Sequence, residues 1–434
     1  MPTPVDADAT RRYTHPAVFG IIELPFGAAV GFLQIAVPYW LAKQGVPLTQ
    51  IAELSAIAFL PHAWKIFWMP LLDAGARRRT WFFAATALTA LLLFVVATLP
   101  DPIHHLGVYT ALITLAQVGA ATSSASVDAL MAITTRPEDK GRAGGFKMAG
   151  NVGGIGVLGT LPIWLSSHMS TTAAGLVVAG VVIATGAAGF LVAAEPVDPV
   201  VRALRGARSA LRAALHRSAN IAGDLWTTIK SREGWTGLVL CVAPVGCGAL
   251  VNLYSAMAGD YHASEGVVEL VSGIFGGGVG AAGAILGGFL ADRMNRRLAY
   301  CLSAGITALT SFAMVAAPMT ATTFAVGSLA YRFANGITMA AFAGVILEMV
   351  AHGPAVATKY TLFVALSNQA ISYVTYLDGQ GSKFRDMGAR GTILVDGVIT
   401  LIGVAIVAVM VLILRRLPPA SDVPRRAPID TAPG

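Results

Sequence analysis

The chain has 434 residues, of which 55% are hydrophobic and 12% are charged, and its mean hydropathy is +0.68. A soluble protein carries about twice that fraction of charged residues, so the composition excludes a soluble globular protein and indicates a membrane protein. The net charge is +7, but no clustered basic face with aromatic or polar readers accompanies it, as nucleic-acid binding would require. We therefore expect membrane lipids, and no nucleic acid, as partners.

Twelve apolar runs are long enough to cross a bilayer, which takes about 20 residues. The first six cover residues 17–41, 50–72, 80–99, 106–133, 143–166 and 172–194. The second six cover residues 234–257, 265–291, 298–317, 321–350, 356–378 and 392–414. The pattern predicts an all-α membrane protein with 12 transmembrane helices in two six-helix bundles, at residues 17–194 and 234–414.

The remaining segments are predicted to be a cytoplasmic N-terminal segment at 1–16, a cytoplasmic linker at 195–233 and a disordered tail at 415–434. In the linker, Arg202, Arg205, Arg208 and Arg212 recur at every third or fourth position. This spacing predicts a basic amphipathic helix on the anionic inner leaflet. A solvated tether between the two bundles is the alternative.

The distribution of Lys and Arg predicts the orientation, because cytoplasmic loops carry an excess of these residues. With a cytoplasmic N-terminus, 24 of the 30 Lys and Arg residues lie on the cytoplasmic side and four on the other side. The last two, Lys65 and Arg332, lie inside predicted spans. We therefore expect both termini in the cytoplasm.

Three pairs of landmarks indicate that the two bundles are a duplication. In residues 69–79 and 288–297, an apolar helix ends on an Asp and a cluster of Arg follows; the two Asp residues, Asp73 and Asp292, lie 219 positions apart. Asp128 and Glu348 end the fourth and tenth spans, 220 positions apart. The segments 146–151 and 363–368, which both begin with Phe and end with Asn, lie 217 positions apart.

The acids and Arg clusters of this repeat predict two cytoplasmic latches. The acid that ends the fourth or tenth helix would bind the Arg cluster and close the cytoplasmic side. The alternative is ordinary interfacial charge, which contributes little. The predicted gating residues are Asp73, Arg77, Arg78, Asp128, Asp292, Arg296 and Glu348.

Parallel repeats of this kind are the architecture of the major facilitator superfamily, and the segment 288–297 resembles the signature loop of that superfamily. The segment Leu60-Pro61-His62-Ala63-Trp64-Lys65-Ile66-Phe67-Trp68-Met69-Pro70-Leu71-Leu72-Asp73 is similar to the second helix of the AmpG-like branch. Residues 124–129 and 357–362 fit the same branch, which includes muropeptide permeases, acetyl-coenzyme A transporters and some siderophore importers. The resemblance implies two bundles in pseudo-twofold arrangement, a monomer, and a place in the bacterial inner membrane.

Charges inside the spans are costly, by at least about 2.5–3.5 kcal/mol each. Glu23 and Lys65 lie at similar depths in the first two spans, which predicts an ion pair in which protonation of Glu23 releases Lys65. The alternative is that Lys65 extends to the cytoplasmic interface. Arg332 lies near the midplane and cannot become neutral, so it needs an anion. Glu269, Asp378 and Asp396 are expected to be hydrated charges at helix ends.

The resemblance implies that the first, fourth, seventh and tenth helices line a central cavity. The residues expected to bind substrate are Lys65, Gln117, Asn252, Tyr331, Arg332, Asn335, Asn368 and Gln369, and the residue expected to couple protons is Glu23.

The sequence therefore predicts a secondary active transporter of a small anionic solute, coupled to protons and working by alternating access. The sequence holds no cofactor motif and no metal-ligand set, and we expect neither group. A membrane enzyme would need a nucleophile with a base, and His62 has no obvious partner for such work. The alternative that remains is a membrane sensor or assembly factor that has kept the fold without transport.

Overall fold

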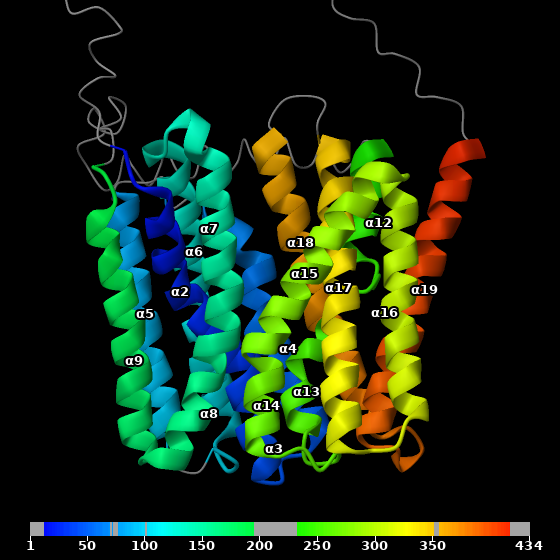
Figure 1. Ribbon diagram of the computed structural model, residues 1–434, viewed down its shortest axis with the longest axis horizontal. Helices are drawn as coiled ribbons and strands as arrows, with labels where there is room; N and C mark the ends of the chain where they lie inside the picture. Colours follow the sequence, from blue (N-terminus) through cyan, green and yellow to red (C-terminus); the bar gives the residue numbers. More distant parts are fainter. Residues whose placement is uncertain are drawn as a thin grey trace, which may run out of the picture.

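In the computed structural model, the described residues are 13–69, 72, 77–99, 102–194, 232–350 and 356–416. All regular elements within these ranges are helices, and they form two groups that stand side by side (Figure 1). Nine of the helical stretches in the described part are long and apolar enough to cross a membrane. The all-α membrane fold expected from the apolar runs is confirmed, and the helix order agrees with 12 crossings.

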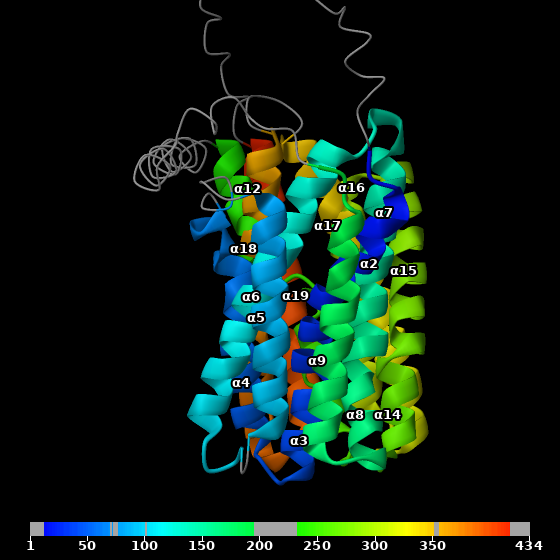
Figure 2. The ribbon, with the colours of Figure 1, turned by 90° about the vertical axis from the view of Figure 1, so that its left-hand side faces the viewer.

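The N-terminal group consists of six crossings, and Figure 2 shows it from the side of α5 and α9. Its elements are α2 (Pro16–Gly31), the π-helix η1 (Phe32–Ala36), α3 (Val37–Lys43), α4 (Leu48–Trp64), the 3-10 turn η2 (Lys65–Phe67), α5 (Arg78–Thr98), α6 (Leu106–Thr134), the 3-10 turn η4 (Pro137–Asp139), α7 (Lys140–Gly153), the π-helix η5 (Gly154–Leu158), α8 (Gly159–His168), α9 (Thr171–Ala187) and η6 (Ala188–Leu191).

The C-terminal group repeats this order with one major difference, which is an interruption of its first crossing. Its elements are α12 (Arg232–Val242), η7 (Ala249–Asn252), α13 (Tyr254–Met257), α14 (Glu265–Ser272), α15 (Ile274–Arg293), α16 (Arg296–Ala316), α17 (Ala321–Val350), α18 (Val356–Gly381), η8 (Phe384–Asp386) and α19 (Ala389–Arg416).

The close approach of α2 to α7 and η5 positions the charged residues of the N-terminal group. A Cβ added to Gly27 would lie 2.6 Å from the Cα of Gly154, so the two backbones touch where both residues lack a side chain. Helices in lipid associate through such small residues, because lipid provides no hydrophobic force between them. The contact brings the polar side chains of α7 against α2.

The expected single helix at 234–257 is wrong, because the backbone leaves the helical path between α12 and η7, where Gly248 adopts a φ of 77°. The freed carbonyl groups are satisfied by three neighbouring helices. Tyr373 donates to the carbonyl of Val242, Tyr300 donates to that of Val245 at 3.2 Å, and Asn335 donates to that of Gly246 at 2.9 Å. Irregular backbone inside a membrane is stable only with such partners or beside a water-filled space.

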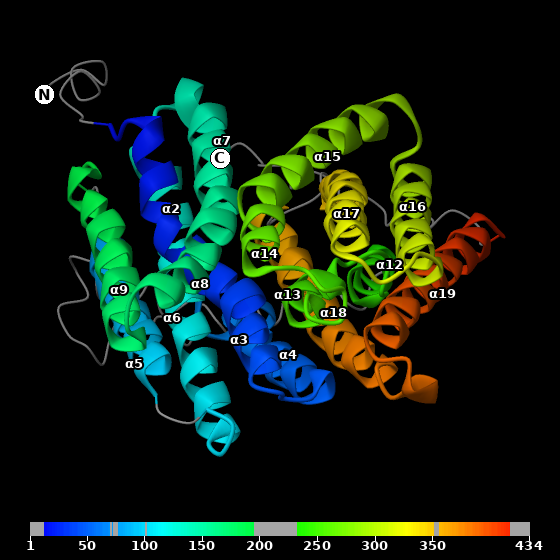
Figure 3. The same ribbon diagram turned by 60° about the horizontal axis from the view of Figure 1, so that its bottom comes forward.

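The two groups are joined at one end of the molecule. We call the end at which α2 begins and α19 ends the terminal end (top of Figure 1), and the opposite end the far end. At the far end Lys43 lies 3.5 Å from Glu265. Along α4 and α18, Ser372 donates to the carbonyl of Ala56, and Asn368 donates to that of His62. Figure 3, with the far end forward, shows α4 beside α18 at the boundary between the groups.

Gly379 controls how closely α4 and α18 approach at the far end, because a Cβ there would lie 2.1 Å from that of Ala52. We predict that Gly379→Leu separates the groups at this end. Spin labels at Gln44 and Lys383, after replacement of Cys241, Cys247 and Cys301, would report the change as a longer distance between the labels.

The matched control is Gly305→Leu, since Gly305 has open space around it. An unchanged distance in Gly379→Leu would contradict the assignment of this contact as the closure.

Candidate functional site

Glu23 is fully buried between α2, α6 and α7. Its Oε1 accepts hydrogen bonds from Ser124 at 2.7 Å and from Asn151 at 3.3 Å, and lies 3.3 Å from the Nζ of Lys147. Its Oε2 has no hydrogen-bond partner among the described residues. One oxygen is thus held by three donors while the other is free to carry a proton.

Lys147 connects this buried carboxylate to a more exposed one. Its Nζ lies 3.0 Å from the Oδ1 of Asp128, whose side chain is 54% exposed, whereas that of Lys147 is 17% exposed. The expected Glu23–Lys65 pair does not form, and Lys147 takes the place of Lys65. The physical reason is the close approach of α2 to α7, which depth along the chain does not reveal.

The signal for Lys147 was present in the sequence. Lys147 and Asn151 are four positions apart, which places both on one face of a helix, and Asn151 belongs to the same repeat landmark.

Lys65 lies in η2, directly after α4, and is partly buried. No carboxylate of the described residues lies within ion-pair distance of it, although the charges of Asp128, Lys147 and Glu23 are close enough to act on it. Its neighbour Trp64 donates a hydrogen bond to Gln369 across the boundary between the groups, at 3.1 Å. Lys65 therefore lies where the two groups meet.

Arg332 lies on α17 with its Nε buried and without a hydrogen-bond partner among the described residues. No described carboxylate lies within ion-pair distance of its guanidinium, and its electrostatic neighbours are the rings of Tyr254 and Tyr331. Gly276 of α15 makes room for the side chain, because a Cβ there would lie 3.1 Å from the Cδ of Arg332. The structure thus contains a partly buried cation, with its Nε buried, that has no anionic partner in the described part of the protein.

Two carboxylates expected to be hydrated helix-end charges are instead buried in the C-terminal group: Asp378 is 0% exposed and Asp396 is 1% exposed. Asp396 accepts hydrogen bonds from Tyr331 at 3.0 Å and from Ser311 at 2.9 Å. Neither oxygen of Asp378 has a hydrogen-bond partner among the described residues. Position near a span end did not predict this burial, because the packing of α18, α19 and η7 covers both groups.

The other residues expected to bind substrate are engaged within the protein. Gln117 is 0% exposed, and its amide both donates to the carbonyl of Ala29 and lies 3.0 Å from His62. Tyr331 is buried against Asp396, and Asn335 holds the interrupted backbone before η7.

Three further amides lie at contacts between helices. Asn252 donates to Thr375 at 2.8 Å, and its Oδ1 is buried without a partner among the described residues. Asn368 and Gln369 bond to α4 across the boundary. These arrangements indicate a structural role for Gln117, Tyr331 and Asn335. Lys65 and Arg332 remain as the groups that could bind a solute.

One of the acid–arginine contacts expected at the latches is present in the described residues, while their gating role stays a prediction. Arg296 lies 3.7 Å from Glu348 in the C-terminal group. In the N-terminal group Asp128 pairs with Lys147 of α7. Asp73 lies outside the described residues, as do the linker at 195–231 and the tail after 416, and the side chain of Asp292 is not described. Arg77 and Arg78 lie at the start of α5.

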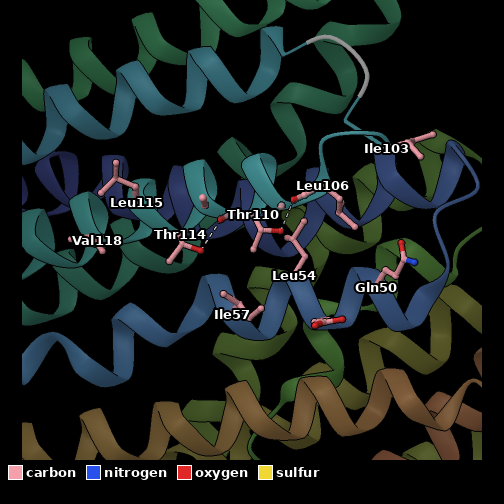
Figure 4. A pocket seen from close by; sticks show the side chains of 12 residues that line it. Gln50, Leu54, Ile57, Ile103, Leu106, Thr110, Thr114, Leu115 and Val118 are labelled. Atoms are coloured by element: carbon pink, nitrogen blue, oxygen red, sulfur yellow. Dashed lines mark hydrogen bonds between the residues drawn. The ribbon is translucent and has the colours of Figure 1, made fainter.

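A groove of about 820 Å³ lies between α4 and α6, away from these charged residues (Figure 4). Leu54, Ile57 and Leu115 give it an apolar wall, and Gln50 and Glu53 lie at its far-end rim. The described residues contain no group of His, Cys, Asp or Glu that could hold a metal ion.

Comparison with known proteins decides the family. Residues 19–372 match the family described as the Major Facilitator Superfamily. The chain belongs to this superfamily of membrane transporters. Among solved structures, a D-xylose-proton symporter is similar, with a TM-score of 0.66 and 14% identity over 91% of this chain and 95% of that one.

A bacterial homolog of the human lysosomal transporter Spinster, in an inward-facing and unoccupied conformation, is also similar to this superfamily member. Its TM-score is 0.65, with 14% identity over 93% of this chain and 98% of that one. At this level of identity the likeness shows the fold alone.

The Glu23–Lys147 contact yields a stability prediction. Removing one member of a buried ion pair leaves an uncompensated charge and costs about 3–5 kcal/mol, so Lys147→Met should lower the melting temperature of the purified protein. Adding Glu23→Gln to that variant should restore part of the loss, because no buried charge then remains unpaired.

The matched control is Lys43→Met, which breaks an ion pair whose Lys is 63% exposed and should cost less than about 1 kcal/mol. A double variant no more stable than Lys147→Met alone would show that the two side chains do not interact.

Proposed function

We propose that this protein is a proton-coupled secondary transporter that carries a small anionic solute across the bacterial inner membrane by alternating access. The observation that carries the proposal is Arg332, a partly buried arginine whose Nε is buried and which has no described carboxylate partner, in a chain of the major facilitator superfamily. An arginine inside a membrane needs an anion, and a carboxylate or phosphate of the solute would match its planar donors.

The proposed orientation puts the terminal end in the cytoplasm, in line with the excess of Lys and Arg on that side. The joined far end then faces the outside, so this conformation would be open toward the cytoplasm. In the alternate state the far-end contacts of α4 with α18 would separate. The contact of Arg296 with Glu348 is formed within the C-terminal group in the present conformation, so cytoplasmic closure would need these charges to meet the N-terminal group.

Glu23 is the proposed proton carrier, with Lys147 in place of Lys65 as the group that responds. When Glu23 is ionised, Lys147 is held between it and Asp128. Protonation removes the negative charge from Glu23, so Lys147 is released toward Asp128. Proton binding thereby changes the electrostatics between α2, α6 and α7.

The proposed solute class follows from the cations and from the AmpG-like resemblance of residues 60–73. Lys65 and Arg332 come from different groups of helices, so one anion contacting both would link them. Muropeptides, ferric siderophores and acyl-coenzyme A compounds all carry carboxylate or phosphate groups. A transport-inactive sensor would have no need of a buried Glu23 with one unpartnered oxygen beside Lys147.

The test is uptake into proteoliposomes of a labelled muropeptide, a ferric siderophore and acetyl-coenzyme A, with an inward proton gradient. We predict that one of them accumulates, and that Glu23→Gln loses gradient-driven accumulation while still exchanging labelled for unlabelled solute. Exchange survives because it requires no net proton movement.

Glu53→Gln is the control, because Glu53 is an exposed carboxylate on the groove. Accumulation at the wild-type rate in Glu23→Gln would remove Glu23 from coupling, and accumulation of none of the three compounds would contradict the solute class.

A further inference from the structure

We infer that Asp378 and Asp396 form a second proton-binding site, in the C-terminal group, and that Asp378 carries the proton while the far end is joined. The inference deepens the proposed function, since it adds a site to the same proton coupling. It starts from the contrast between the two carboxylates, which are equally buried but differ in their hydrogen bonds.

Asp396 is placed to remain ionised. Both of its oxygens accept a hydrogen bond, one from Tyr331 of α17 and one from Ser311 of α16. Hydrogen bonds donated to a carboxylate favour its charged form. Asp378 has no such donor among the described residues, so its charged form is disfavoured, and a carboxylate without a partner in the membrane interior becomes neutral by binding a proton.

No cation of the described residues makes a hydrogen bond or ion pair to Asp378; Arg390 of the packed helix α19 instead donates to the carbonyl of Ala317 at 3.0 Å. The charge of Asp396 on α19 acts on Asp378. The charge of Asp378 in turn acts on three groups: Cys247 of the interrupted segment, Tyr254 of α13 and Tyr331 of α17. The packed elements α4 and η2 also carry titratable groups, namely Glu53, His62 and Lys65, but none of these makes a hydrogen bond or ion pair to Asp378.

Because the charge of Asp396 acts on Asp378 and like charges disfavour double ionisation, the pair would hold one proton between them. Two further buried oxygens, Asn252 Oδ1 and Thr392 Oγ1, also lack partners in the described residues. Thr392 lies one helical turn before Asp396 on α19, and Asn252 bonds to Thr375, one turn before Asp378 on α18. A proton on Asp378 would add a donor to a region in which the Asn252 Oδ1, which can only accept, has no described partner.

The position of Asp378 links its proton to the conformation. The next residue, Gly379, packs on Ala52 of α4 at the far-end closure. A charge at Asp378 would draw water to this contact and oppose closure, whereas the neutral acid permits it. Tyr331, which bonds to Asp396, precedes Arg332 on α17, so the acid pair and the proposed anion site share one helix.

The test is infrared difference spectroscopy of the purified protein in lipid, which detects the carbonyl stretch of a protonated carboxyl group and requires no solute. We expect a band at neutral pH that is lost in Asp378→Asn. It should persist in Glu23→Gln and in the control Asp386→Asn, whose side chain is exposed in η8. Asp378→Glu should keep a shifted band, which also shows that a carboxyl group there is compatible with folding.

Identical spectra for the wild type and Asp378→Asn would overturn the inference, because Asp378 would then be ionised. Loss of the band on replacing potassium with sodium would also overturn it, since the site would then take a sodium ion. A failure of the proposed function is distinguishable: the band would be present while proteoliposomes showed no proton-driven uptake.

Discussion

The structure depends on one constraint, which is that every charge inside the membrane must meet an opposite charge, hydrogen-bond partners, a proton or a ligand. Glu23 meets Lys147, and Asp396 meets two hydroxyl groups. Arg332 and Asp378 meet none of these among the described residues. An arginine cannot lose its charge, so Arg332 calls for an anion from outside the protein, whereas Asp378 can become neutral by taking a proton. The two unbalanced positions thus differ in what they would bind.

The two helical groups meet this constraint with different residues. The repeat offset of 217 places Val364 of α18 at the position of Lys147 in α7. Without that Lys, the acid of the C-terminal half, Glu348, lies near Arg296 instead. The first crossing also differs, since it is a continuous helical path in the N-terminal half and is interrupted before η7 in the other. The proposed proton site beside Lys147 and the proposed anion site beside Arg332 therefore lie in halves that differ in these features.

The crossings were predictable from the sequence because lipid solvation requires long apolar runs, and the positions of α5, α6, α16 and α17 agree with those runs to within a few residues. The partner of Glu23 was not predictable from the sequence, because chain position gives the depth of a residue but not the direction in which its side chain points. That direction is set by contacts such as Gly27 with Gly154. The burial of Asp378 and Asp396 escaped prediction for a related reason, since it depends on helices that pack around them. Pro244, Gly246 and Gly248 indicate the interruption before η7, but the apolar composition around them also fits a single continuous span.

The central claim is that the anion missing beside Arg332 is the transported solute. Equilibrium binding of that solute to purified wild type, Arg332→Lys and Arg332→Gln tests it most directly, with Arg293→Gln as the control for an exposed Arg on α15. Loss of one partner of a buried charge pair costs about 2 kcal/mol or more. We therefore predict affinity lower by roughly 30-fold or more in Arg332→Gln, a smaller loss in Arg332→Lys, and wild-type affinity in the control. Unchanged affinity in folded Arg332→Gln would contradict the account.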